Sequence, residues 1–363
     1  MGVIATDVLV IGAGVVGLST SIEAALERRQ VICLDMHGVA NSVGASGDGL
    51  RLFRLSYFEH ASYVPLLRQA IENWKSLGDD LYVPAGGLYA GPPDSLLVSG
   101  SLESALLHEI DYEILSSGEV NQRFPHFALP ENYLGFFETE GGYIHSNKAT
   151  QVLAKKADSM GVQIVQDKAL QIQSVGSKWI VLSESASYMA ERVIVCAGAA
   201  TADLVPRVGR YLVREPHLVA WFDSPSWTDL PGFGIMNEAE EMLYGFPAVD
   251  AIPGVKLGGH HNFSHGSTIE QQKGIQELGA HFMPNLSQNV IARRSCDYDM
   301  SPDGHFMIGE LEKGLTVACG FSGHGYKFGS VIGEIVINAA FGSLDDELSF
   351  LDVNRFTSTS GLT

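Results

Sequence analysis

The chain is 363 residues long, which is enough for two domains with substantial apolar cores. Lys and Arg number 23 against 42 Asp and Glu, so the formal net charge is −19. This acidic balance argues against nucleic acid and anionic membranes as partners, because both attract clustered cations. The four cysteines lack metal-ligand spacing, and no leader or membrane-spanning apolar run is evident, so we expect a cytoplasmic protein without a metal site.

The N-terminal segment predicts a strand, a helix and a second strand. Residues 6–11 (TDVLVI) form a short apolar run that ends in glycine, as a buried parallel strand does. Leu18, Ile22 and Leu26 then recur every four residues and give the single apolar stripe of a helix packed on a sheet. Residues 31–34 predict the second strand, so the segment is a βαβ unit.

A Gly-x-Gly-x-x-Gly motif joins the first strand to the helix, at Gly12, Gly14 and Gly17. In this context Gly12 permits a tight turn, Gly14 lets the backbone approach a pyrophosphate, and Gly17 lets the helix pack on the strand. The pyrophosphate would meet the N–H groups at the helix N-terminus. Asp35 ends the second strand, where a carboxylate can accept from ribose hydroxyls. The motif therefore predicts a bound dinucleotide.

The rest of the chain is less regular. Residues 41–49 are rich in Gly, Ser and Asp, which indicates a loop, and residues 241–260 show a hairpin pattern with its turn at 247–254. Apolar patterns predict helices at 63–77, 148–160 and 329–340, and strands at 86–91, 134–145, 162–165, 179–182, 192–198 and 315–320. Strands that end in small residues occur at both ends and in the middle of the chain. The cofactor domain is therefore expected to be assembled from separate segments.

Several motifs beyond the glycines resemble the amine-oxidising FAD enzymes of the monomeric sarcosine oxidase and N-methyltryptophan oxidase type, within the D-amino-acid-oxidase-like superfamily. They run almost end to end: VIGAGVVGLS, RLFRLSY, YVPLLRQAIENW, YGFP, VKLGGHH, SCDYDMSPDGHFMIG and GFSGHGYKFGS. The last two are specific, because the family usually shows Cys-x-Tyr followed by Pro-Asp-x-His-Phe, and then Phe-Ser-Gly-His-Gly. The resemblance implies that the dinucleotide is FAD.

These observations predict an α/β fold with two domains. The first is a Rossmann-like FAD-binding domain of βαβ type, built from residues 1–80, 145–205 and 290–363. The second is a mainly antiparallel-sheet substrate-binding domain, built from residues 81–144 and 206–289. The active site is expected between the two domains, where pockets commonly form.

Cys296 lies in the first of the two specific motifs. The resemblance implies that its sulfur is bonded covalently to the 8α methyl of the flavin. Such a bond requires a thiolate at the ring edge, and the neighbouring Arg293 or Arg294 could lower the thiol pKa. A free cysteine considered alone is more often buried and inert, so the surrounding motif carries this prediction.

Lys256, His260 and Arg51 are the candidate catalytic residues. Lys256 and His260 lie four apart in a predicted strand, so both point to the same face, with Tyr244 on the partner strand. Such a face is more often simply solvated. The resemblance instead implies that Lys256 lies at the flavin ring where oxygen is reduced, since a cation there stabilises the developing negative charge. It also implies that His260 lies in the substrate cavity and Arg51 against the flavin.

The resemblance also assigns substrate-binding and cofactor-binding residues. Arg54 and Lys327 are expected to bind the substrate carboxylate, a task that suits the planar guanidinium. The other residues expected at the substrate are Tyr244, Tyr298 and His324. Flavin contacts are implied at Gly12, Gly14, Val15, Val16, Gly17, Asp35, Met36, Ser46, Arg51, Ala169, Ala197, Gly198, Cys296, Phe321, Gly323, His324, Gly325 and Lys327.

Together these assignments predict an FAD-dependent oxidase of the C–N bond of a small amino acid, with an N-methyl or other secondary amine, that gives an imine or aldehyde and hydrogen peroxide. Its partners would be the substrate and oxygen, and it would act as a monomer or small homo-oligomer. Alternatives are a dehydrogenase that reduces a quinone or carrier protein, and an oxidase of fructosyl amino acids or cyclic imino acids. An RNA-modifying or non-catalytic flavin module is disfavoured by the charge of −19 and by the intact Arg54, Lys256 and Lys327.

Overall fold

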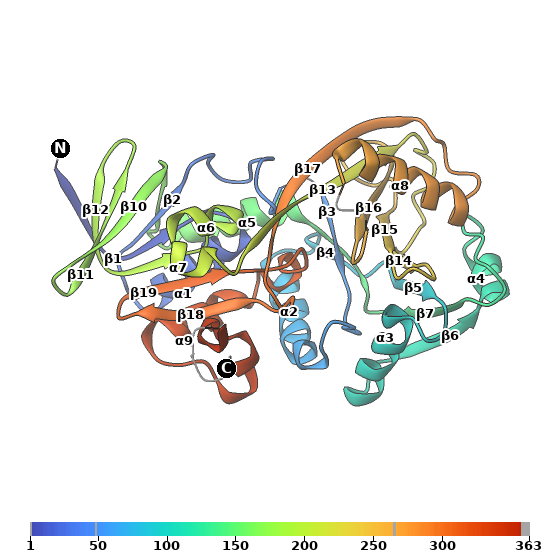
Figure 1. Ribbon diagram of the computed structural model, residues 1–363, viewed down its shortest axis with the longest axis horizontal. Helices are drawn as coiled ribbons and strands as arrows, with labels where there is room; N and C mark the ends of the chain where they lie inside the picture. Colours follow the sequence, from blue (N-terminus) through green and yellow to red (C-terminus); the bar gives the residue numbers. More distant parts are fainter. Residues whose placement is uncertain (1, 48, 264–265, 357–363) are drawn as a thin grey trace. The chain divides into compact units, whose positions relative to one another are not determined.

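The chain divides into two compact units (Figure 1). The computed structural model describes residues 2–47, 49–263 and 266–356. Unit 1 comprises the described parts of Met1–Asp48, Ser146–Glu215 and Asp297–Thr363. Unit 2 comprises the described parts of Gly49–His145 and Pro216–Cys296.

The units differ from the expected domains at residues 206–215, which cluster with unit 1, at 145 and 290–296, which cluster with unit 2, and in one long segment. Residues 49–80 were expected with the FAD-binding domain but cluster with unit 2. The cause is strand pairing: β3 (Leu50–Phe53) pairs with β8 (Gly142–His145), and β4 (Tyr82–Val83) pairs with β8 on its other side. The helix α2 (Val64–Leu77), which lies between β3 and β4 in the chain, packs on β4.

Unit 1 is built on an eight-stranded sheet. The strand order is β10-β11-β12-β1-β2-β9, with β19 paired to both β12 and β18. Four pairs of strands are parallel: β19 with β12, β12 with β1, β1 with β2, and β2 with β9. This parallel pairing explains the uninterrupted apolar run of β1. The bounds are β1 Val3–Ile11, β2 Val31–Asp35, β9 Gln163–Gln166, β10 Ala169–Val175, β11 Lys178–Ser183, β12 Ser187–Val195, β18 Met307–Glu312 and β19 Leu315–Cys319.

Helices pack on this sheet and on one another. α1 (Val15–Leu26) buries Leu18 and Ile22 as predicted, and it contacts α5 (Ser146–Ser159) and α9 (Ile332–Phe341). α9 approaches α1 closely at Gly333, where a Cβ atom would lie 2.4 Å from the backbone of Ser19. The short helical turns of unit 1 are η2 Gly198–Ala200, α6 Thr201–Leu204, α7 Pro206–Gly209, η3 Tyr326–Phe328, η4 Asp346–Leu351 and η5 Val353–Phe356.

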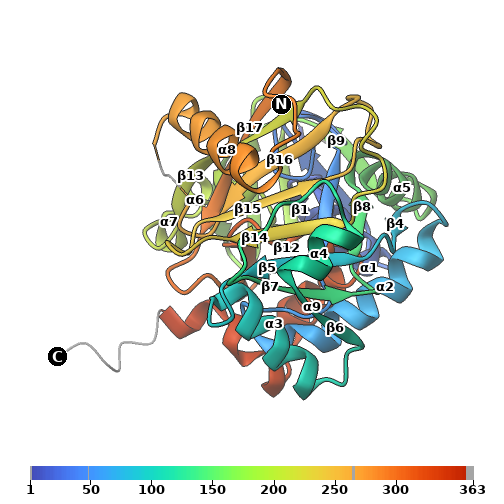
Figure 2. The same ribbon diagram turned by 90° about the vertical axis from the view of Figure 1, so that its right-hand side faces the viewer.

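Unit 2 contains a mainly antiparallel sheet in the order β17-β13-β16-β15-β14-β5-β7-β6 (Figure 2). β14 and β5 are parallel, whereas β13–β16, β16–β15, β15–β14, β5–β7 and β7–β6 are antiparallel. The predicted hairpin at 241–260 is β15 followed by β16. The bounds are β5 Gly87–Gly91, β6 Tyr112–Ser116, β7 Leu134–Glu138, β13 Val213–Phe222, β14 Gly232–Met236, β15 Met242–Phe246, β16 Val255–His260 and β17 Val290–Met300.

Helices cover part of this sheet and close its core. α8 packs on β16, and Leu257 of that strand shares a fully buried cluster with Phe222, Phe233 and Phe282. The helices of unit 2 that have not yet been given are η1 Ala61–Tyr63, α3 Leu96–Leu107, α4 Ser117–Arg123 and α8 Thr268–Phe282. In the described part of the chain, every helix is too short or too polar to cross a bilayer.

Candidate functional site

The glycine motif of unit 1 forms a turn that side chains would block. Gly12 has φ +106°, and a Cβ atom on it would lie 2.4 Å from the carbonyl oxygen of Cys196. A Cβ atom on Gly17 would lie 1.7 Å from the carbonyl oxygen of Gly12. Gly14 is the N-cap of α1 and provides no capping side chain, and its own Cβ would lie 2.9 Å from Ser46 Oγ. The turn and the helix start therefore present backbone N–H groups, as a pyrophosphate site requires.

Two polar side chains brace this turn. Asp35, at the end of β2, accepts through Oδ2 from the Ala13 amide at 2.8 Å and through Oδ1 from the His37 amide at 2.8 Å. Each carboxylate oxygen has two lone pairs, so capacity for ribose hydroxyls is left. Ser46 Oγ accepts from the Val15 amide at 3.0 Å. Backbone N–H groups at a helix start beside an acidic residue fit the ADP part of FAD.

Apart from Arg51, the remaining residues expected at the flavin in the N-terminal two thirds of the chain lie in unit 1, most of them near strand ends. Val16 is in the first turn of α1, and Met36 follows β2 and is exposed. Ala169 begins β10, while Ala197 and Gly198 come two and three residues after the end of β12, with Gly198 at φ +53°. In a parallel sheet, ligands bind outside the carboxyl ends of strands, and Met36, Ala197 and Gly198 lie just beyond the ends of β2 and β12.

Cys296 differs from the other three cysteines of the chain in its exposure. It is partly exposed on β17, whereas Cys33, Cys196 and Cys319 are buried. Burial raises the pKa of Cys33 and of Cys196 to about 12, so those thiols are poor nucleophiles. Cys296 is thus the cysteine best able to meet a cofactor. Across the described ranges, no group of three or more His, Cys, Asp or Glu could hold a metal ion.

In unit 2, Lys256 is a buried cation on the sheet. Its side chain is 2% exposed and lies beside two aromatic rings, with Nζ 5.2 Å from the Trp221 ring centre and 5.3 Å from that of Phe246. These two residues are its neighbours on the adjacent strands. Nζ donates to the Leu50 carbonyl oxygen at 3.0 Å. The ammonium is therefore held in a low-dielectric setting, where its field acts strongly.

Arg51, Tyr244 and His260 gather around the same strands. Arg51 Nη1 donates to the carbonyl oxygen of the preceding residue, Leu50, at 3.1 Å. Arg51 and Lys256 therefore share one acceptor. Tyr244 lies opposite Gly258, and a Cβ atom at 258 would be 2.6 Å from the tyrosine ring. The Tyr244 ring centre is 6.5 Å from that of His260. The hairpin thus brings together the residues that sequence analysis placed on one face.

Arg54 is a buried guanidinium in unit 2. It is 2% exposed, and Nη2 donates to Glu59 Oε1 at 2.5 Å. The Phe58 ring centre lies 4.3 Å from Cζ. Burial acts to lower the Arg54 pKa, but Glu59, Tyr57 and Tyr89 together outweigh it, and the pKa is raised above its ordinary value. The Nη1 atom is buried without a hydrogen-bond partner in the structure. A charged donor in this state is suited to an anion.

The glycine-rich segment 320–325 of unit 1 has an unusual backbone. Gly320, Ser322 and Gly323 have φ values of +64°, +48° and +77°, and Ser322 is the one residue of the three with a side chain. Ser322 Oγ accepts from the Ser301 amide at 3.1 Å and donates to the Gly320 carbonyl at 3.2 Å. These bonds hold a serine in the left-handed region, a conformation that costs energy and persists only where the surroundings enforce it.

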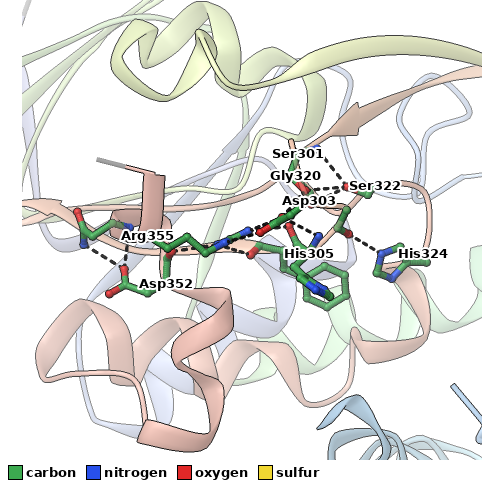
Figure 3. A network of polar contacts seen from close by, with 11 residues as sticks. Ser301, Asp303, His305, Gly320, Ser322, His324, Asp352 and Arg355 are labelled. Carbon is green, nitrogen blue, oxygen red and sulfur yellow. Dashed lines mark hydrogen bonds and ion pairs between the residues drawn. The ribbon is translucent and has the colours of Figure 1, made fainter. Parts of the chain in front are cut away.

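A network of polar contacts supports this segment (Figure 3). His324 Nε2 is 2.9 Å from the Gly304 carbonyl, which can only accept, so Nε2 carries a proton. Asp303, on the same loop as Gly304, receives two bonds from Arg355, from Nε at 2.8 Å and from Nη2 at 2.9 Å. Arg355 Nη1 also donates to the Phe306 carbonyl at 3.0 Å. The C-terminal turn η5 therefore ties down the loop that orients His324.

The remaining predicted residues of unit 1 surround this segment. A Cβ atom on Gly323 would lie 2.2 Å from the ring of Tyr298, so the ring lies directly on the glycine. A Cβ atom on Gly325 would lie 2.5 Å from the ring of Phe321. Lys327 is buried, and its Nζ donates to the His324 carbonyl at 2.9 Å. The predicted residues on this segment are thus packed together within unit 1.

Sequence analysis missed three residues that hold these groups. The pairing of Glu59 with Arg54 could have been predicted from the sequence, because an acid five residues after Arg54 in a short segment is a candidate ion-pair partner. Glu138 and Arg355 gave no such indication. Glu138 accepts from the Leu55 amide, 83 positions away, and Arg355 reaches Asp303 across 52 positions.

The chain is similar in sequence to known flavoproteins over nearly its whole length. A family model described as FAD dependent oxidoreductase matches residues 7–339. Monomeric sarcosine oxidase of Streptomyces avermitilis is 29% identical, over 96% of this chain and 97% of its own length. N-methyl-L-tryptophan oxidase of Yersinia pestis is 29% identical, over 97% of this chain and 98% of its own length.

Solved structures share the fold at lower identity. NikD, an amino acid oxidase of nikkomycin biosynthesis, has a TM-score of 0.82 at 21% identity, over 96% of this chain and 97% of the other. Amadoriase I of Aspergillus fumigatus has a TM-score of 0.81 at 19% identity, over 98% and 90%. L-proline dehydrogenase of P. horikoshii has a TM-score of 0.82 at 17% identity, over 98% and 99%. These likenesses bear on the fold alone, and they agree with the predicted α/β flavoprotein fold.

Proposed function

The chain belongs to the FAD dependent oxidoreductase family, and we propose that it oxidises the C–N bond of a small amino acid and passes the electrons to oxygen. The names of its sequence relatives, a sarcosine oxidase and an N-methyltryptophan oxidase, support a secondary amine that carries a carboxylate. The observation that carries the proposal is the buried Arg54, whose Nη1 has no hydrogen-bond partner among the described residues. A substrate carboxylate would satisfy that donor.

Bound FAD supplies the two-electron acceptor, a chemistry that side chains do not provide. We propose that Arg54, with Lys327 of unit 1 as a second cation, binds the substrate carboxylate. The amine must be neutral before it can give up electrons. Arg51, Arg54 and Lys256 place three positive charges in unit 2, and like charges disfavour an ammonium group. Tyr244, Tyr298, His260 and His324 are proposed to line the substrate.

We propose that Lys256 favours oxygen as the electron acceptor. Its buried ammonium would stabilise the negative charge that develops as oxygen is reduced to hydrogen peroxide. Cys296, partly exposed and set in the specific motif, is proposed to form the covalent bond to the flavin. A cytoplasmic location and a monomer or small homo-oligomer stay predictions of the sequence analysis.

A substrate panel tests the proposal. Purified holoprotein is mixed anaerobically with N-methyl amino acids, cyclic imino acids and fructosyl amino acids, and the yellow flavin absorbance is followed. We expect at least one amino acid to bleach the flavin, and admission of air to restore the colour with release of hydrogen peroxide. Bleaching that air does not reverse, but a quinone does, would show a dehydrogenase. No bleaching by any member of the panel would contradict amino-acid oxidation.

A further inference from the structure

We infer that Glu138 is a positioning residue that fixes Arg54 for carboxylate binding, an inference that rests on the proposed function. Glu138 ends β7 and its side chain is completely buried in unit 2. Oε1 accepts from the Leu55 amide at 2.8 Å, and Oε2 accepts from the Ser56 amide at 2.8 Å. The carboxylate thus accepts hydrogen bonds from the backbone N–H groups of the two residues that directly follow Arg54.

The surroundings of Glu138 are built to keep it in this place. Tyr89 donates to Glu138 Oε1 at 3.0 Å from the neighbouring strand β5. Gly87 lies directly opposite Glu138, and a Cβ atom there would come within 2.2 Å of the tyrosine hydroxyl oxygen. A Cβ atom on Gly141 would lie 2.8 Å from Glu138 Oε1. Two glycines therefore leave the space that the carboxylate and its tyrosine partner occupy.

Glu138 and Glu59 have different tasks although both lie near Arg54. Glu59 pairs with the guanidinium itself. The groups that favour the ionised form of Glu138 are hydrogen-bond donors: Ser56, Leu55 and Tyr89. Burial raises the Glu138 pKa, and these donors act against that rise. A buried carboxylate held by two consecutive amides fixes the local backbone, because leaving either amide unpaired is costly.

The position of this backbone determines where the Arg54 head lies. β3 ends at Phe53, so no strand pairing holds residues 54–56. The two bonds to Glu138 replace that pairing at the first two positions after Arg54. A shift of this segment would move the guanidinium away from a substrate carboxylate, and recognition by hydrogen bonds tolerates little displacement.

The substitution Glu138→Gln tests the inference with little change of volume. A glutamine side chain has one acceptor oxygen, so its NH2 group would face the N–H of Leu55 or Ser56, donor against donor. We expect the apparent Kd for sarcosine, or for the panel amino acid that reduces the flavin fastest, to rise about ten-fold or more. The Kd for the matching carboxamide should stay within about two-fold of wild type. The readout is anaerobic flavin reduction by each compound in the holoenzyme.

Tyr89→Phe is the matched control. It removes the third bond to Glu138 but leaves both amide contacts and the ring beside Arg54. Its preference for the acid over the amide should fall far less than that of Glu138→Gln, because both amide contacts remain. Loss of this preference in Tyr89→Phe as large as that in Glu138→Gln would assign the effect to general damage of the cluster and overturn the inference.

Arg54→Ala separates the inference from the proposed function. If Arg54→Ala loses the preference for the acid and Glu138→Gln keeps it, Glu138 does not position Arg54, while the proposed function stands. If Arg54→Ala keeps the preference, carboxylate binding by Arg54 fails, and the inference fails with it. If Glu138→Gln gives no folded holoenzyme, Glu138→Asp retains the charge and both acceptors on a shorter side chain. A partial loss of preference is expected there, and a wild-type value would overturn the inference.

Discussion

Replacement of Arg54 by alanine removes the buried guanidinium on which the proposed substrate class depends. In the part of the chain that the structure describes, Nη2 donates to Glu59 at 2.5 Å, and Nη1 is buried without a hydrogen-bond partner. A substrate carboxylate can therefore bind at Nη1 while the Glu59 pair stays intact. A charge-assisted hydrogen bond of this kind contributes about 1.5–3 kcal/mol.

The substitution should cost more than that one bond. Without Arg54, the Glu59 carboxylate, whose side chain is 15% exposed, loses this cation and repels a second carboxylate. The total loss on truncating one partner of a buried charge pair is about 2–5 kcal/mol. Binding of an amino acid should therefore weaken by about thirty-fold to several thousand-fold. Arg54→Lys should recover only part, because an ammonium lacks the two-pronged geometry.

The double variant Arg54→Ala/Glu59→Gln separates the two contributions. It lacks the hydrogen bond but also lacks the repelling charge, so about ten-fold to 150-fold weaker binding is expected. Anaerobic titration of flavin reduction gives the apparent Kd for an amino acid and for its carboxamide. The carboxamide should bind wild type, Arg54→Ala and the double variant with about the same apparent Kd. Tight binding of the amino acid to Arg54→Ala would refute the reasoning, since Arg54 would then be a structural cation.

Four further predictions follow from the same structure. Lys256→Met should slow oxidation of the reduced flavin by oxygen about a hundred-fold or more, far more than it slows reduction by substrate; equal oxidation rates would remove its role. Cys296→Ala should release FAD on acid precipitation, whereas wild type should keep the colour with the protein; complete release from wild type would contradict the covalent bond. Arg355→Gln should lower Tm by a few degrees, because five hydrogen bonds to Asp303 and backbone carbonyls are lost; a Tm equal to wild type would show that the network contributes nothing. Burial raises the pKa of Asp299 from 3.8 to about 6, so the folded protein binds this proton more tightly than the unfolded chain does. Wild type should therefore gain stability relative to Asp299→Asn as the pH falls from about 7 to about 4. A difference in Tm between the two proteins that does not change with pH would contradict this.

The sequence determined the elements whose signals are local. The βαβ unit follows from a periodic apolar stripe and from glycines that no other residue could replace, such as Gly12 at φ +106°. The hairpin of β15 and β16 follows from a short turn between two apolar runs, and it fixes Lys256, Tyr244 and His260 on neighbouring strands. The helix α8 had a local signal too, the capping box of Ser267 and Glu270, but sequence analysis assigned no element there.

Only the tertiary structure decided how distant segments combine. Residues 49–80 joined unit 2 because β3 pairs with β8, and a strand's partner depends on edges that the strand's own sequence does not encode. The same holds for the buried polar contacts. The Leu50 carbonyl oxygen accepts from Lys256, which lies 206 positions away in the sequence. Glu138 accepts from the Leu55 amide, which lies 83 positions away. Buried polar groups must find a partner, and which partner they find depends on the packing of the whole unit.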